Sequence, residues 1–254
     1  LLKKYQNITT EVKESFYNIE NVNQKIDEFF DKNSTKNNKD LSTNELSTVG
    51  SLICYLELTQ KNNIPCLKNL QKIERNDFMQ VDLFSERSLE IFVKTDGEKS
   101  GSLLDILDET KTSIGARLLR EFMKHPRVDK KTISFRHDCI ESLINDDEVL
   151  RKIRDNLEGV PDAERAFSRI SAYTNNPRDL ILLNIFLIRS EQIFKTLKVS
   201  KSKTLNMLII DKNNQQILNN IKKTIQSQIN ENPPINLSEG GVIKNGVLKK
   251  LDEL

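Results

Sequence analysis

Apolar residues in the second half of the chain recur every three or four positions, the spacing of one face of an α-helix. From Ser102 onward the pattern is almost wholly helical, with breaks at 110–113, Pro126, 159–161 and 175–177. The stripes are Leu118, Leu119, Phe122 and Met123; Ile133, Ile140, Leu143 and Ile144; Phe167 and Ile170; Leu180, Leu183, Leu187, Phe194 and Leu197; and Leu218, Ile221, Ile225 and Ile229. The sequence therefore predicts a mainly α fold, a multi-helical array of long amphipathic helices packed in an extended manner.

The first part of the chain has a different pattern. Residues 21–30 favour a helix, and the polar run 31–40 favours a loop. A second helix is expected to begin with Ser42 or Thr43 as N-cap, to place Leu46, Val49, Ile53 and Leu56 on one face, and to end at Asn62, Asn63, Ile64 and Pro65. A short β-strand is predicted at 78–82 and a helix capped by Ser85, so a domain boundary near residue 76 is expected.

Two local signals shape the rest of the chain. Asn176 as N-cap, Pro177 at the first helical position and Asp179 in the first turn specify a helix start. Residues 235–244 alternate around a glycine turn and predict two short β-strands, followed by an amphipathic helix from Val247. That helix is short, and the chain does not begin with Met, so we expect a fragment of a longer protein.

Charge and cysteine content exclude several classes of protein. Lys and Arg number 39 against 37 Asp and Glu, so the chain lacks the basic surplus of a domain that holds DNA by itself. Cys54, Cys66 and Cys139 fit neither a disulfide framework nor a metal-binding spacing, which indicates a reduced, cytoplasmic setting. The longest apolar run falls far short of the roughly 20 residues of a membrane span.

No catalytic, cofactor-binding or metal-binding residue is predicted. Residues 241–246 have the glycine spacing of a phosphate loop, but Val247 and Leu248 stand where a Lys and a hydroxyl residue are needed. His125 and His137 have no accompanying ligand pair. The basic run from Lys195 to Lys203 could touch a phosphate backbone, although such runs are mostly solvated helix ends.

One helix is expected to tether its neighbour. Residues 162–170 combine acidic, basic and apolar positions at helical spacing. Arg165 and Arg169 share a face there, and could hold the following segment through Asp179. Such a contact would give the helix at 162–170 a structural role and requires no other function.

The most informative segment is 107–129, a short acidic helix followed by a Thr-x-Thr-x-x-Gly-x-Arg turn and an amphipathic helix that a proline closes. Its motif residues are Asp108, Thr110, Thr112, Gly115, Arg117 and Pro126. It resembles the opening of the core domain in the MutS family of DNA mismatch repair proteins. Segment 78–91 resembles the family's entry into that core, and segments 162–180 and 233–254 resemble its later parts, in the same order. Phe122 departs from the family's usual Trp, and Ala163 from its usual Leu.

The resemblance implies an organisation and a function. Residues 1–76 would be the end of a connector domain, and 77–254 the core and descending half of a lever, before the clamp. The parent protein would bind mismatched double-stranded DNA as a homodimer, with ATP and magnesium held elsewhere, and would act with other mismatch repair proteins. This piece would transmit movement rather than catalyse, with hinges at 110–113 and 174–177. Its family-motif residues, with structural roles, are Asp108, Thr110, Thr112, Gly115, Arg117, Pro126, Arg165, Pro177, Arg178, Asp179, Gly240 and Gly241. The alternative is an autonomous helical interaction scaffold with no nucleic-acid role.

Overall fold

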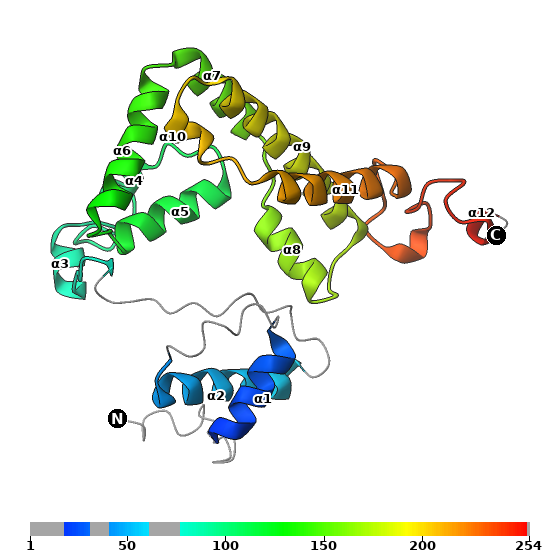
Figure 1. Ribbon diagram of the computed structural model, residues 1–254, viewed down its shortest axis with the longest axis horizontal. Helices are drawn as coiled ribbons and strands as arrows, with labels where there is room; N and C mark the ends of the chain where they lie inside the picture. The colour runs from blue at the N-terminus through cyan, green and yellow to red at the C-terminus, as the bar shows by residue number, and fades with distance from the viewer. Residues whose placement is uncertain (1–17, 31–40, 61–76, 253–254) are drawn as a thin grey trace. The chain divides into compact units, whose positions relative to one another are not determined.

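A computed structural model describes residues 18–30, 41–60 and 77–252, which fall into two compact units. The first contains helices α1 (Ile19–Phe29) and α2 (Thr43–Gln60), and Ser171–Tyr173 are assigned to it. The second contains the remaining described residues (Figure 1). The predicted mainly helical fold is confirmed. The expected loop at 31–40, the helix end at 62–65 and Cys66 lie outside the described residues.

The first unit is a pair of crossed helices with a small apolar core. Val22 and Ile26 of α1 meet Ile53 of α2, and each of the three is at most 2% exposed. The helices approach closely because Gly50 has no side chain: a Cβ there would lie 2.0 Å from Cγ2 of Val22. The predicted α2 start is confirmed, since the Ser42 N–H donates to the Glu45 carboxylate at 2.7 Å.

The second unit is a succession of helices, and the four predicted breaks all separate helices in it. Further breaks at 145–146, 200–202 and 207–211 were not among those predicted. Their bounds are α3 Leu83–Ser88, α4 Leu103–Leu107, α5 Ser113–Lys124, α6 Lys130–Ile144, α7 Asp147–Leu157, α8 Ala163–Ser171, α9 Pro177–Val199, α10 Lys203–Asn206, α11 Lys212–Gln228 and α12 Lys249–Asp252. Side-chain caps fix the starts locally: Thr112 accepts the Gly115 N–H at 2.9 Å, and Asp129 accepts the Thr132 N–H at 2.8 Å.

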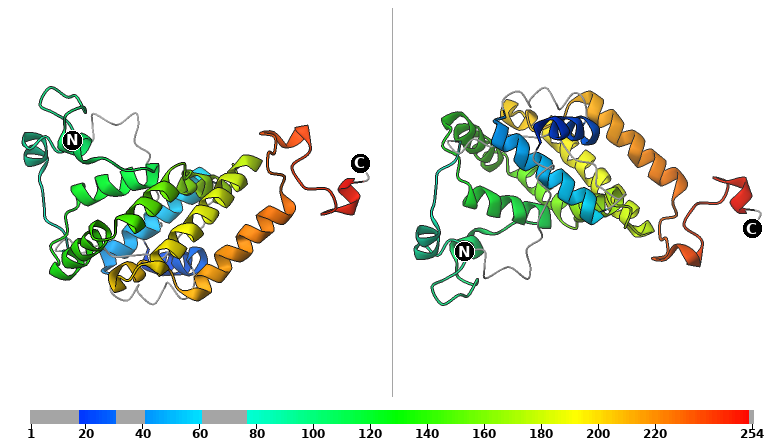
Figure 2. Two further views of the ribbon diagram at one scale, coloured as in Figure 1. Left: turned by 90° about the horizontal axis from the view of Figure 1, so that it is seen from above. Right: turned by 90° about the horizontal axis from the view of Figure 1, so that it is seen from below.

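Helix α9 organises this unit, because α7, α10 and α11 all pack against it (Figures 1 and 2). The buried core lies near its C-terminal end, where Leu197 meets Val149 of α7 and Leu205 of α10. Of the predicted α9 stripe, Leu187 and Leu197 are buried. No helix in the described part of the chain is both long enough and apolar enough to cross a membrane.

The predicted minor strands are corrected. Neither 78–82 nor 235–244 forms a strand. Phe78 makes one antiparallel bridge with Arg127, and Ile243 makes one with Ile229 at the end of α11. Residues Leu237–Glu239 form a 3₁₀ turn instead. The alternating pattern marks extended backbone, but Gly240 and Gly241, with φ of 71° and 68°, turn the chain before a second strand can pair.

The predicted start of the helix near residue 85 was also wrong. Helix α3 begins at Leu83 and is capped by Asp82, whose carboxylate accepts the N–H groups of Phe84 and Ser85. The Ser85 hydroxyl donates to the same carboxylate at 2.8 Å, so it supports the cap rather than forming it. The helix ends at Ser88, before the expected positions Leu89 and Phe92.

Candidate functional site

The turn before α5 is built from side-chain hydrogen bonds. The Asp108 carboxylate accepts the N–H of Thr110 at 3.1 Å and its hydroxyl at 2.6 Å. Thr112 then caps α5 through the Gly115 N–H. This is an Asx-type turn leading directly into an N-cap, so Asp108, Thr110 and Thr112 fix the direction in which α5 leaves the turn.

Gly115 serves this turn rather than a helix crossing. A glycine in the first turn of a helix can permit the close approach of another helix. A Cβ at Gly115 would instead lie 3.0 Å from the Thr112 Oγ1 and 3.5 Å from the Thr110 Cβ. The missing side chain therefore lets the preceding turn fold over the first residues of α5.

Arg117 joins α5 to the start of α8. Its guanidinium donates from Nη1 and Nη2 to the two oxygens of Asp162, at 2.7 and 2.8 Å. It also donates from Nη2 to Glu164 at 2.7 Å. These bonds lower the pKa of Asp162 and raise that of Arg117. The two-pronged geometry fixes orientation as well as distance, so this contact defines the first joint, Arg117 with Asp162 and Glu164.

Arg169 joins α8 to α9. Its Nε donates to both oxygens of Asp179 at 3.1 Å, and Nη2 makes a further short bond to Oδ1. The Asp179 side chain is 2% exposed and also accepts the Asn176 N–H at 3.0 Å. The hydrogen bond from Arg169, followed by the Asn176 N–H, lowers the pKa of Asp179. This second joint therefore holds a buried carboxylate in its ionised form at the start of α9.

The other motif residues are dispersed. Arg165 was expected to share the contact with Asp179, but its Nε lies 3.2 Å from Asp162 within its own helix start. Arg178 donates to the carbonyl of Pro233 at 3.2 Å, which fastens the start of α9 to the segment after α11. Pro126 follows α5, and its carbonyl accepts the Met79 N–H at 2.8 Å. Pro177 is buried at the first turn of α9, while Gly240 and Gly241 lie in an open turn.

Sequence reasoning missed a set of arginine–ring contacts around α5. Arg136 of α6 lies 3.6 Å from the ring centroid of Phe122, and Arg120 lies 4.4 Å from that of Phe92. Phe122 was expected to pack in an apolar stripe, but its side chain remains 37% exposed. The guanidinium covers one ring face, and such contacts contribute about 0.5–1 kcal/mol at exposed sites.

The described residues offer little to a metal ion or a triphosphate. No group of three or more His, Cys, Asp and Glu side chains converges among them. In the loop at 241–246, the Gly246 N–H donates to the Asp252 carboxylate at 2.9 Å. One backbone amide of the loop is thus directed at an acid instead of being available to a phosphate. The contacts described above orient helices relative to one another.

The second unit is a helical domain in which the two joints set the relative orientation of α5, α8 and α9. Residues 85–253 match the family model described as MutS domain III. That match covers well over half of the chain, so the chain belongs to the MutS family, as its motifs indicated.

Curated relatives agree with this assignment. The chain is 34% identical over 215 residues to the DNA mismatch repair protein MutS of Streptococcus gordonii, covering 84% of this chain and 25% of the relative. It is 36% identical over 210 residues to the protein of the same name from Streptococcus mutans, covering 82% and 24%. The MutS of Trichodesmium erythraeum is 36% identical over 206 residues, covering 81% and 22%. The chain therefore spans about a quarter of the length of these relatives.

Proposed function

We propose that the chain is the domain III portion of a DNA mismatch repair protein and that it transmits movement between an ATPase and a clamp that closes on DNA. The parent protein would bind mispaired duplex DNA as a homodimer in an ATP-dependent manner, together with other mismatch repair proteins. The family match over 85–253 and the names of the relatives support this proposal. The cytoplasmic location stays a prediction.

The observation that carries the transmission role is the pair of joints. Arg117 couples α5 to the start of α8, and Arg169 couples the body of α8 to the first turn of α9. A displacement of α5 is therefore passed to α9 through α8 rather than absorbed in the intervening turns. Helices linked in this way move together, so the second joint argues against the hinge expected at 174–177, which it spans. The break at 110–113 precedes α5 and remains a candidate hinge.

Under this proposal the chain itself catalyses no reaction. ATP and magnesium would bind in another part of the parent, because the loop at 241–246 does not fit a triphosphate. Val247 and Leu248 follow that loop where the motif has a Lys for the outer phosphates and a hydroxyl residue for magnesium, so both groups are missing from their required positions. Its Gly246 N–H already has an acid as partner.

The alternative of a helical interaction scaffold has one observation in its favour. Several large apolar side chains of α3 and its end are exposed: Leu83 by 71%, Phe84 by 79% and Leu89 by 66%. Exposed apolar patches mark surfaces that bind other proteins or other parts of the same protein. Binding of an unrelated protein through these residues, with no effect of the joints on DNA handling, would favour the scaffold.

The transmission role is tested in the full-length protein that contains the chain. Fluorescence transfer between labels on the ATPase and the clamp reports ATP-driven movement on mismatched DNA. We expect Arg117→Gln to reduce the coupling between ATP binding and clamp movement about threefold to tenfold, the range of a modest change in coupling energy. Arg165→Gln is the matched control, because Arg165 contacts the same Asp162 without linking two helices. Equal behaviour of Arg117→Gln and the native protein would refute the role.

A further inference from the structure

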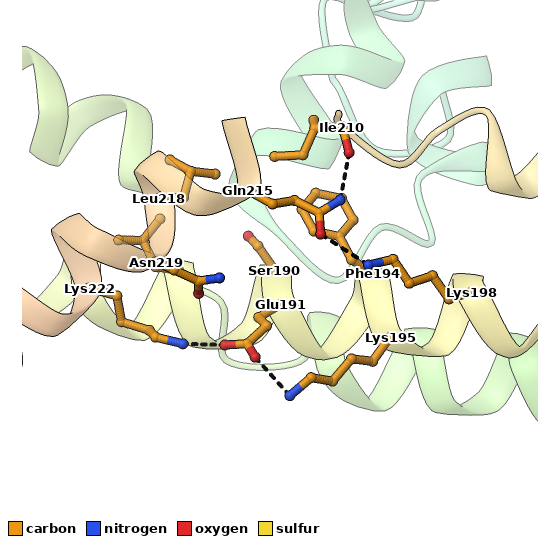
Figure 3. Close-up of a pocket in the computed structure, with 11 residues that line it drawn as sticks. Ser190, Glu191, Phe194, Lys195, Lys198, Ile210, Gln215, Leu218, Asn219 and Lys222 are labelled. Carbon is orange, nitrogen blue, oxygen red and sulfur yellow. Dashed lines mark hydrogen bonds and ion pairs between the residues drawn. The ribbon is translucent and has the colours of Figure 1, made fainter. Parts of the chain in front are cut away.

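A groove separates the facing sides of α9 and α11 in the second unit (Figure 3). It encloses about 250 Å³, somewhat below the roughly 300–1,000 Å³ of typical small-ligand pockets. Its apolar lining comes from Leu187, Phe194, Ile210 and Leu218. The size and lining suit one or two apolar side chains of a bound segment better than a large rigid ligand.

The rim of the groove carries an excess of positive charge. Lys195, Lys198 and Lys222 line it together with a single acid, Glu191, so three positive charges face one negative charge. Glu191 accepts from Lys195 at 2.7 Å and also from Lys222, and these bonds lower its pKa to about 2. Lys198 instead donates to the neutral amide of Gln215 at 3.0 Å. The charge of Lys198 is therefore available to an acidic partner.

Two polar side chains in the groove have unused hydrogen-bonding capacity. Asn219 and Ser190 line it and are half-buried, and neither side chain makes a hydrogen bond within the described ranges. Figure 3 shows both between the lysines, without a dashed contact. The amide of Asn219 offers a donor and an acceptor together, which matches a peptide group. A phosphate accepts hydrogen bonds and would leave the acceptor unused.

We propose that this groove binds an acidic peptide segment of a partner protein. An apolar side chain of the peptide enters against Phe194 and Leu218, a neighbouring carboxylate pairs with Lys198, and the peptide backbone bonds to Asn219. Duplex DNA fits less well, because the groove is a small concavity lined in part by apolar side chains. The inference concerns a partner surface and stands independently of the transmission role.

Fluorescence anisotropy with the 254-residue chain tests the proposal. The probe is a fluorescein-labelled, capped nonapeptide that alternates Asp or Glu with Leu, and its control has Asn and Gln in place of the acids. We expect the acidic probe to bind and the neutral probe to bind about threefold to fivefold more weakly, the upper part of the range for a partly exposed ion pair. Lys198→Gln should weaken the acidic probe about threefold, and Asn219→Ala about fivefold.

Lys223→Gln is the matched control, since Lys223 is an exposed residue of α11 that does not line the groove. It should leave binding unchanged, and circular dichroism should show equal helix content in all variants. Equal weakening by Lys223→Gln, or equal binding of both peptides, would overturn the proposal. Displacement of the probe by a 20-base-pair duplex or by inorganic phosphate, with the same dependence on Asn219, would replace it with a phosphate site.

Discussion

The buried carboxylate of Asp179 gives the sharpest test of the second joint. Replacing it by Asn keeps the size of the side chain and keeps an oxygen for the Asn176 N–H, but removes the negative charge that faces Arg169. A hydrogen bond to a charged group contributes about 1.5–3 kcal/mol. Because the Arg169 side chain is 42% exposed, water can solvate it once the partner is neutral. We therefore expect Asp179→Asn to lower the free energy of unfolding by about 2 kcal/mol.

A second substitution separates charge from hydrogen bonding. Asp179→Ala also leaves the Asn176 N–H without its acceptor, so its total cost should rise to about 3 kcal/mol. The free energy of unfolding of each variant is measured by urea unfolding, followed by the helical circular dichroism signal. Asp138→Asn is the control, because Asp138 is an exposed acid of α6. It should change the free energy of unfolding by less than about 0.5 kcal/mol.

The pH dependence follows from the lowered pKa of Asp179. As the pH falls, the unfolded chain takes up the proton first, near its ordinary pKa of about 3.9. The stabilisation is therefore fully present above about pH 5 and is lost as the pH falls through the lower folded value. The native chain and Asp179→Asn should converge in stability on acidification. A stability difference that stays constant from pH 7 to pH 3, or an Asn variant as stable as the native chain, would refute the reasoning.

Three further substitutions test other contacts by the same unfolding measurement. Gly50→Ala should destabilise the α1–α2 pair by about 1–3 kcal/mol, because its Cβ would meet Val22 at 2.0 Å; unchanged stability would show that the crossing can relax. Phe122→Trp should raise stability by up to about 1 kcal/mol, since indole is the better partner for the Arg136 guanidinium; a loss would show that the larger ring does not fit. Gly241→Ala should cost about 1 kcal/mol through its φ of 68° alone, and no loss would mean that the turn re-forms with another geometry.

Short-range signals in the sequence were sufficient for most helix starts. The start of α9 could be predicted because Asn176, Pro177 and Asp179 act on the same helical turn. The start of α3 was misplaced because Asp82 and Ser85 are both good caps three residues apart, and only the structure shows that Asp82 accepts the amides. Which of the two residues caps α3 depends on which side-chain oxygen lies within reach of the free N–H groups of the first turn. The residue types alone do not determine this.

The first joint could not be predicted from its residues. Arg117 and Asp162 are 45 positions apart, and many other acids lie at helix starts in between. The contact between Arg169 and Asp179 spans only ten positions across a single helix break, so it could be predicted from the sequence. The groove between α9 and α11 was missed because Lys195, Lys198 and Lys222 come from two helices whose packing no local pattern specifies.

The unequal spans of the two joints also bear on the order in which the chain folds. Closing a loop of 45 residues rather than ten costs about 1.3 kcal/mol more in chain entropy. When the complete chain refolds from denaturant, we therefore expect the contact between α8 and α9 to form first and α5 to dock afterwards. During synthesis that order is not imposed, because Arg117 and Asp162 are both made before Arg169 and Asp179.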